Sequence, residues 1–249
     1  MKIISFLPFI LLLSCQCFSQ TLRIAVAANA QFVMQSLKDA FEKQDAAQLE
    51  LVISSSGKLT AQIEHGAPYA IFLSADMRYP EALYKKGFAT SKPQVYAYGK
   101  LVLWTLKDIN MHDGIGIIQQ PGIKTIAIGN PATAPYGVAT VQALKKAGLY
   151  DPVKKKIVLG ESISQVNQYL ITGAADVAFT AKAIVLNPKM KNRGKWVEIN
   201  DSLYQPIKQG TVILTYAKGK TLQAARRFYH FLFSAKAKAI FTAYGYRIN

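Results

Sequence analysis

Residues 50–68, ELVISSSGKLTAQIEHGAP, contain the change from strand to helix that decides the fold class. The apolar run 51–53 predicts a buried strand, and Leu59 and Ile63, four residues apart, predict one apolar helix face that ends at Gly66. Three serines, a glycine and a lysine stand between strand and helix. Such a turn suits a phosphate loop, a nucleophilic serine, a bound oxyanion or an ordinary helix cap, and the rest of the chain has to distinguish these four uses.

The same order of strand and helix is found on both sides of this stretch. Because each strand is apolar on both faces and a helix follows it, the pattern predicts an α/β fold with mostly parallel sheets. A second unit of this kind occupies the middle of the chain. The predicted strands are 22–30, 49–56, 69–76, 124–131, 155–160 and 175–183, and the predicted helices are 30–44, 57–66, 77–87, 136–148, 162–173 and 223–245.

Two long β-type stretches, 94–107 and 204–219, lie before and after the second unit. They indicate a middle lobe, residues 99–216, inserted into an outer lobe made of 21–98 and 217–249. Two crossing strands form a hinge, and hinged lobes usually close on a ligand held in the cleft between them.

The first twenty residues, MKIISFLPFILLLSCQCFSQ, combine a basic start, an apolar core and small residues at the end. They predict a signal peptide, residues 1–19, and export to the periplasm. A less favoured alternative is a lipoprotein anchored through Cys15. Because Cys15 and Cys17 are the only cysteines, the exported chain has no disulfide and depends on its hydrophobic core.

The chain of 249 residues carries a formal net charge of +16. Such a charge raises the possibility of a polyanionic partner. The lysines are scattered, however, and the longest run is only KKK at 154–156. We therefore expect a solvated basic surface and no nucleic-acid partner.

The serine turn does not match a phosphate-binding loop. That motif requires Ser or Thr directly after its lysine and a glycine five residues before its second glycine. Here Leu59 follows Lys58, and Val52 stands five residues before Gly57.

A serine nucleophile lacks the groups that would activate it. His65, His112 and His230 lie outside the strand-end turns that carry serines, and no G-x-S-x-G elbow occurs. Ser55 and Lys58 have S-x-x-K spacing, but the accompanying S-D-N and K-T-G motifs are absent. The sequence predicts that the protein is not an enzyme and that it needs no cofactor.

The remaining interpretation is a bound oxyanion. Helix N-termini carry unpaired N–H donors and positive partial charge, so an anion fits there without a nearby cation. Four turns, near Asn29, Ser56, Tyr136 and Ile163, open helices at the carboxyl ends of strands, where α/β sheets bind ligands. Each turn alone is an ordinary helix start, and it is their combination in a two-lobed exported chain that favours an anion site.

Several segments resemble one family in order and spacing, from about residue 22 to the C-terminus. The chain is similar to the substrate-binding proteins of molybdate ABC transporters. The resemblance implies a two-lobed, type II periplasmic-binding-protein fold, with two hinge strands, which binds molybdate or tungstate as a monomer and delivers it to a permease in the inner membrane. The matching segments are AVAANA (25–30), SSSGKLTAQIEHGAP (54–68), IFLSAD (71–76), IAIGNPATAPYG (126–137) and GAADVAFTAKA (173–183).

The resemblance also implies the binding residues. Asn29 provides a polar side chain beside the Ala28 amide, and Ser56 provides its hydroxyl and its N–H. The middle lobe adds the backbone amides of Tyr136 and Ile163.

The chain departs from the family pattern at three places, one of which is Ala70, where members often have Asp. Many members have Ser at the position of Asn29, and some have a ligand Tyr where this chain has Thr180, a weaker candidate. Lys58 is expected to point away, because the family selects its anion by hydrogen bonds and cavity size. The same fold binding sulfate or phosphate remains an open alternative, and the sequence does not separate molybdate from tungstate.

Overall fold

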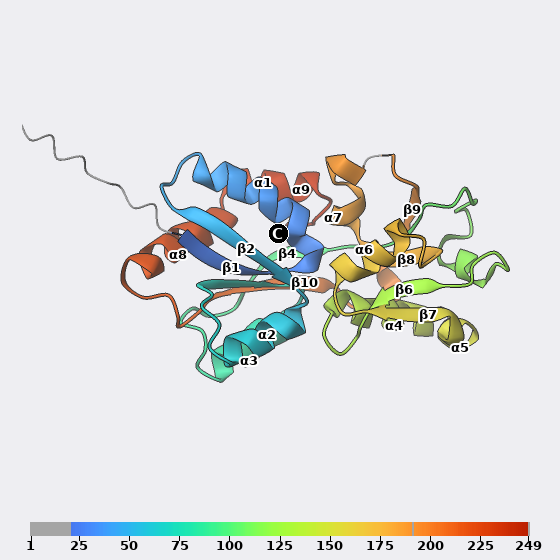
Figure 1. Ribbon diagram of the computed structural model, residues 1–249, viewed down its shortest axis with the longest axis horizontal. Coiled ribbons are helices and arrows are strands. Elements are labelled where there is room, and N and C mark those ends of the chain that lie inside the picture. Colours follow the sequence, from blue (N-terminus) through green and yellow to red (C-terminus); the bar gives the residue numbers. More distant parts are fainter. Residues whose placement is uncertain (1–20, 191, 249) are drawn as a thin grey trace, which may run out of the picture.

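The computed structural model describes residues 21–190 and 192–248, so the expected signal peptide and Cys15 lie outside the described residues. Two five-stranded sheets, each flanked by helices, form two lobes side by side (Figure 1). This confirms the expected two-lobed α/β fold. The strands are β1 (Thr21–Ala27), β2 (Gln48–Ser54), β3 (Ile71–Ser74), β4 (Gln94–Gly99), β5 (Leu101–Thr105), β6 (Ile126–Gly129), β7 (Ile157–Gly160), β8 (Val177–Ala181), β9 (Lys195–Glu198) and β10 (Ile207–Ile213).

The outer lobe is built on a sheet of order β2-β1-β3-β10-β4. Strands β1, β2 and β3 run parallel, as their helical crossovers require, whereas β10 is antiparallel to both neighbours. Separate hydrophobic clusters join the helices to the two faces of this sheet. One face carries α1 (Gln31–Glu42), α8 (Gly219–Leu232) and α9 (Ala235–Ala243), and the other carries α2 (Ser56–Glu64) and α3 (Arg78–Lys85).

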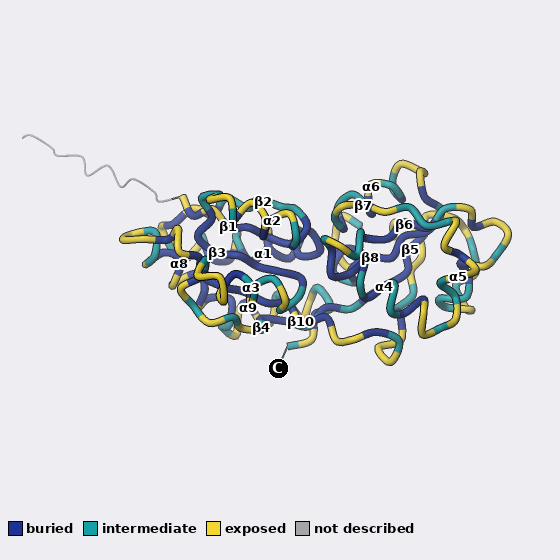
Figure 2. Tube along the Cα trace, turned by 90° about the horizontal axis from the view of Figure 1, so that it is seen from below, coloured by how far each residue is buried: buried dark blue, intermediate teal, exposed yellow. Residues whose placement is uncertain are grey.

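The middle lobe repeats this plan with a sheet of order β7-β6-β8-β5-β9. Strands β6, β7 and β8 are parallel, and β5 and β9 extend the sheet in antiparallel pairs. Each lobe has a continuous buried interior along its strands (Figure 2). The helices of this lobe are α4 (Pro135–Lys146), α5 (Tyr150–Val153), α6 (Ile163–Ile171) and α7 (Lys182–Val185).

The chain crosses between the sheets twice. Lys100 alone separates β4 from β5, and the return path runs through residues 199–206 before β10 enters the outer sheet. The two crossings are tied together, since the Lys100 ammonium pairs with Glu198 at 3.2 Å and also with Asp201. The sheets therefore divide the chain at Lys100 and within 199–206. The boundary between middle and outer lobe that the sequence pattern indicates after residue 216 stays a prediction.

The C-terminal helical segment consists of two helices instead of the single expected one. Ser234 begins α9, where its Oγ accepts a hydrogen bond of 3.2 Å from the Ala237 N–H. Such a cap satisfies N–H groups that a new helix leaves free, so the chain turns at this point. Phe228 and Phe241, on different helices, are both fully buried. No helix within the described residues is long and apolar enough to cross a membrane.

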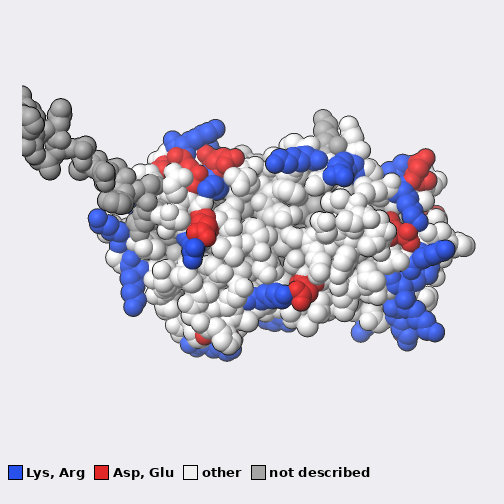
Figure 3. Space-filling model, in the orientation of Figure 1, with Lys and Arg blue, Asp and Glu red and all other residues white. Residues whose placement is uncertain are grey.

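The basic side chains are scattered over the surface, as the sequence predicts. On the face in Figure 3, Lys and Arg side chains lie around the edge and at both ends, several beside Asp or Glu, and the centre is largely uncharged. Lys154 lies 3.5 Å from Asp151, for example, and Arg23 lies 2.7 Å from Glu50.

Candidate functional site

A small pocket lies between the lobes, at the carboxyl ends of strands from both sheets. Its wall is formed by residues that follow β1, β2 and β3 in the outer lobe and β6 and β7 in the middle lobe. The pocket is lined by Ala27, Ala28, Asn29, Ser55, Ser56, Ala75, Ala134, Pro135, Tyr136 and Ile163. The structure thus brings together five sequence-predicted residues, from four separate turns, in one wall.

Ser55 and Ser56 make different hydrogen bonds at the start of α2. Ser55 is the helix cap, and its side chain accepts a hydrogen bond of 3.3 Å from the Lys58 N–H. The Ser56 hydroxyl oxygen accepts one of 3.0 Å from the Ala75 N–H. Its own hydrogen can therefore be donated elsewhere, and its backbone N–H lies in the first helical turn, where no intrahelical acceptor precedes it. Ser56 offers two donors at the pocket.

Asn29 is almost completely buried, with 1% of its surface exposed. Its Nδ2 donates to Gln209 Oε1 at 2.9 Å and to the Tyr246 hydroxyl at 3.2 Å. Its Oδ1 has no hydrogen-bond partner among the described residues. The adjacent Ala28 also lines the pocket, so two consecutive residues of the turn after β1 belong to its wall.

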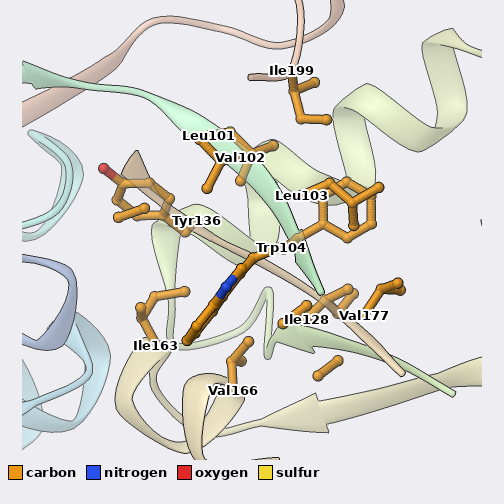
Figure 4. Packing of buried hydrophobic residues seen from close by; sticks show 14 of the residues in the cluster. Leu101, Val102, Leu103, Trp104, Ile128, Tyr136, Ile163, Val166, Val177 and Ile199 are labelled. Carbon is orange, nitrogen blue, oxygen red and sulfur yellow. The ribbon is translucent and has the colours of Figure 1, made fainter. Parts of the chain in front are cut away.

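The middle lobe faces the pocket with the beginnings of α4 and α6. Tyr136 is the second residue of α4 and Ile163 is the first residue of α6. Both side chains belong to the buried cluster of this lobe, although the Tyr136 hydroxyl points away from it (Figure 4). A Cβ at Gly137 would overlap the Gly129 carbonyl, so glycine is needed for α4 to start this close to β6. The middle lobe therefore offers mainly backbone N–H groups and the positive ends of two helices.

The wall of the pocket is uncharged within the described residues: it contains no Lys, Arg, Asp or Glu. Burial raises the pKa of Tyr136 well above its ordinary value, so its phenol stays neutral. Lys58 pairs with Glu161 of the opposite lobe, and both side chains are largely exposed. Lys58 thus takes part in a contact between the lobes. No group of His, Cys, Asp and Glu in the described chain could hold a metal cation.

Direct contacts hold the two lobes together around the pocket. The Gly57 N–H donates to the Thr133 carbonyl at 2.9 Å, and the Tyr79 hydroxyl donates to the Ala132 carbonyl at 3.2 Å. On another side, Ser164 Oγ donates to Gln31 Oε1 at 2.9 Å. A Cβ at Gly57 would lie 2.9 Å from Thr133 Cα. Its lack of a side chain thus allows the two lobes to approach each other.

Thr180 is not part of the pocket wall. Its side chain is fully buried in β8, where Oγ1 donates to Asn167 Oδ1 at 2.7 Å. Conversely, sequence reasoning missed Gln209 and Tyr246, which bond to the Asn29 side chain, and Tyr96, which bonds to Gln209. The sequence contains only one signal for Gln209, a polar residue followed by glycine inside a strand-like stretch.

Two hinged lobes with donor groups converging between them define a solute-binding protein, which binds a ligand and releases it unchanged. The sequence comparison agrees. Residues 22–247 match the model of the bacterial extracellular solute-binding protein family, and the chain belongs to this family.

Individual relatives are also similar along nearly their whole length. The molybdate-binding protein ModA of Azotobacter vinelandii is 38% identical over 239 residues, 96% of this chain and 94% of that protein. ModA of Rhodobacter capsulatus is 34% identical over 89% of this chain and 86% of that protein.

Two solved structures of binding proteins have a fold similar to that of this chain. The periplasmic molybdate-binding protein of Azotobacter vinelandii superposes with a TM-score of 0.85 at 36% identity, covering 92% of this chain and 99% of that one. The sulfate-binding protein SubI of Mycobacterium tuberculosis has a TM-score of 0.74 at 12% identity, covering 92% of this chain and 87% of that one, and shares the fold alone.

Proposed function

We propose that this protein binds molybdate, and also tungstate, in the pocket between its lobes. The observation that carries the proposal is the convergence of the Ser56 hydroxyl and four helix or turn starts on an uncharged wall. A tetrahedral oxyanion is an acceptor on every side, and it suits a site whose free groups are N–H and O–H donors. The names of the relatives support molybdate as the anion.

The binding residues of this proposal are Asn29 and Ser56 through side chain and backbone, and Ala28, Tyr136 and Ile163 through backbone N–H groups. A hydrogen bond to a charged group contributes about 1.5–3 kcal/mol, so five of them support sub-micromolar binding. Because the donors belong to both lobes, only the closed arrangement lets all of them reach one anion. Thr180 is left out of this set, since it lies outside the pocket wall.

The protein would work in the periplasm and deliver its anion to an ABC transporter permease. The family is extracellular, and the solved relative from Azotobacter vinelandii is described as periplasmic. A monomer is sufficient for this role, because one chain contributes both walls of the pocket.

Calorimetric titration of the purified protein with molybdate, tungstate, sulfate and phosphate tests the function. We expect tight binding of the first two and weak or no binding of the others, because a smaller anion leaves buried donors unpaired. Binding of sulfate or phosphate alone would replace molybdate by the alternative anion, and binding of none would reject the proposal.

A further inference from the structure

Behind the pocket, a buried polar network surrounds the side chain of Gln209 in β10. Gln209 is fully buried, and its Oε1 accepts from Asn29 Nδ2 at 2.9 Å and from the Tyr96 hydroxyl at 3.1 Å. Its Nε2 donates to the Tyr136 hydroxyl at 3.3 Å. Tyr246 completes the network through its bond to Asn29. Gln209 therefore connects a residue of the pocket wall in one lobe to a residue of the other lobe.

The backbone is shaped to hold Gln209 in this place. The pairing of β10 with β4 shifts its register between Gln209 and Gly210, as it does at a β-bulge. Bulges re-aim side chains and are frequent beside binding sites. On the facing strand, a Cβ at Gly99 would overlap the Tyr136 hydroxyl and lie 2.5 Å from Gln209 Nε2. Gly99 is also the last residue before the hinge crossing, so the network lies against the hinge.

The side-chain amide of Asn29 presents a difficulty for anion binding. Both bonds of Nδ2 are made to residues outside the pocket wall, and Oδ1 is the buried atom without a partner. An oxyanion without hydrogen accepts only, so it can use this amide only through Nδ2. A half turn of the amide exchanges the two atoms and gives the anion a donor.

The half turn of Asn29 is possible only if Gln209 turns as well. After both turns, Gln209 Nε2 donates to Asn29 Oδ1 and to Tyr96, and Gln209 Oε1 accepts from Tyr136. The Tyr246 hydroxyl, which can donate or accept, donates to Asn29 Oδ1. Tyr96 can keep its 3.4 Å bond to the Ser74 carbonyl. Each side-chain group of this network then has a partner, in exchange for the 3.4 Å bond that the Tyr246 hydroxyl donates to the Asn29 carbonyl.

We propose that Gln209 is a specificity-determining positioning residue whose amide sets which atom of Asn29 faces the pocket. This inference rests on the proposed binding of an oxyanion. With Nδ2 facing the pocket, the site favours molybdate, which has no hydrogen at neutral pH. With Oδ1 there, it favours hydrogen phosphate, whose O–H needs an acceptor. Gln209 thus biases the choice between anions although it does not touch them.

The test is Gln209→Glu, which keeps the shape of the side chain. An ionised Glu has no donor, so it can only accept from Asn29 Nδ2 and fixes Oδ1 toward the pocket. Burial raises the pKa of such a carboxyl group, and in acid its O–H can donate to Asn29 Oδ1 again. We expect molybdate affinity about ten- to hundredfold below wild type at pH 8.5, recovering toward wild type at pH 5.5. Phosphate affinity should fall less at pH 8.5.

The tyrosines bonded to this network do not change their charge between pH 5.5 and 8.5, so they do not contribute to this pH profile. Tyr96, Tyr136 and Tyr246 are the titratable side chains bonded to the network, and burial raises the pKa of each above its ordinary value. They remain neutral at both pH values. Gln205→Glu adds the same charge at an exposed position four residues away in the chain and should leave molybdate affinity and its pH profile unchanged.

Gln209→Met provides a second test should Gln209→Glu fail to fold. It has no donor, only a weak acceptor and no titratable group, so it should weaken molybdate binding about tenfold equally at pH 5.5 and 8.5. Melting temperatures without anion show whether each variant is folded. Wild-type affinity in either folded variant, or a loss in Gln209→Glu that acid does not relieve, overturns this inference alone. Failure of the wild-type protein to bind any oxyanion overturns the proposed function and this inference with it.

Discussion

The two lobes contribute to the pocket in different ways. The outer lobe lines the pocket with polar residues, among them Asn29 and Ser56. The middle lobe contributes the N-termini of α4 and α6, while the side chains of Tyr136 and Ile163 are packed in its hydrophobic core. In the proposed site, the outer lobe would thus recognise the anion through side chains, and the middle lobe through the backbone N–H groups at two helix starts.

This difference predicts how each wall responds to substitution. Changing an outer-lobe side chain removes or reverses a donor directly. Changing a middle-lobe side chain leaves its N–H in place and affects mainly folding stability or the closeness of the lobes. Four measurements of affinity, in order of decreasing expected effect, test this contrast.

Asn29→Asp should produce the largest loss. It places a carboxylate against a dianion at nearly unchanged shape, and such like-charge contacts cost several kcal/mol, which corresponds to more than a hundredfold. Calorimetry with molybdate at pH 7.5 measures it. Asn200→Asp is the matched control, because this exposed cap accepts from the Ser202 N–H and Asp caps equally well. If Asn29→Asp binds molybdate nearly as tightly as the wild-type protein, Asn29 does not contact the anion.

Ser56→Ala should weaken molybdate binding by about 1.5–3 kcal/mol, roughly ten- to hundredfold, because it removes one donor to a charged group. Titration of the variant measures the loss. Ser234→Ala serves as control. It removes the cap of α9, costs about 1 kcal/mol of stability and leaves the pocket intact. Equal affinities of the two variants would contradict a direct role of the Ser56 hydroxyl.

Lys58→Gln should weaken binding only up to about fivefold, since exposed ion pairs contribute about 0.2–1 kcal/mol. The effect should disappear in 1 M salt, where such pairs are screened. Lys86→Gln is the matched control, because Lys86 pairs at 2.8 Å with Glu64 within one lobe. If the two variants behave alike at low salt, the pair between Lys58 and Glu161 does not help closure.

Ile163→Val should change affinity least, by less than about threefold, although Ile163 lines the pocket. Its N–H is kept, while loss of one buried methylene costs about 0.5–1.5 kcal/mol of stability. Denaturant unfolding and calorimetry measure the two quantities. Ile128→Val, in the same cluster but outside the pocket wall, should behave alike. A tenfold affinity loss in Ile163→Val alone would show that its side chain shapes the site.

Much of the architecture could be read from local patterns. Apolar runs followed by helical spacing, as in residues 50–68, predicted the α/β units, and the two long β stretches predicted a two-lobed chain. The turns after β1, β2, β6 and β7 could be named as candidate site because carboxyl ends of strands meet at one edge of a sheet. Their assignment to one anion remains a proposal, and the proposal is testable by the variants above.

Other features depend on contacts that no local pattern records. A break at Ser234 arises because a serine in a helical run can cap a new helix, and hydrophobic spacing alone continues across it. Thr180 lies outside the pocket wall, where its Oγ1 donates to Asn167 Oδ1, a partner from another element that no local pattern indicates.

The sequence by itself determined the class of fold, the hinge and the donors that begin each helix, because these follow from the periodicity of apolar residues and from turn chemistry. Only the tertiary structure decided which groups meet across the pocket. Gly57 lies against Thr133 of the other lobe, which leaves no room for a side chain there. Gln209 lies at a register shift of β10 and bonds to Asn29. Both facts rest on residues far apart in the chain, and only packing of the two lobes brings such residues together.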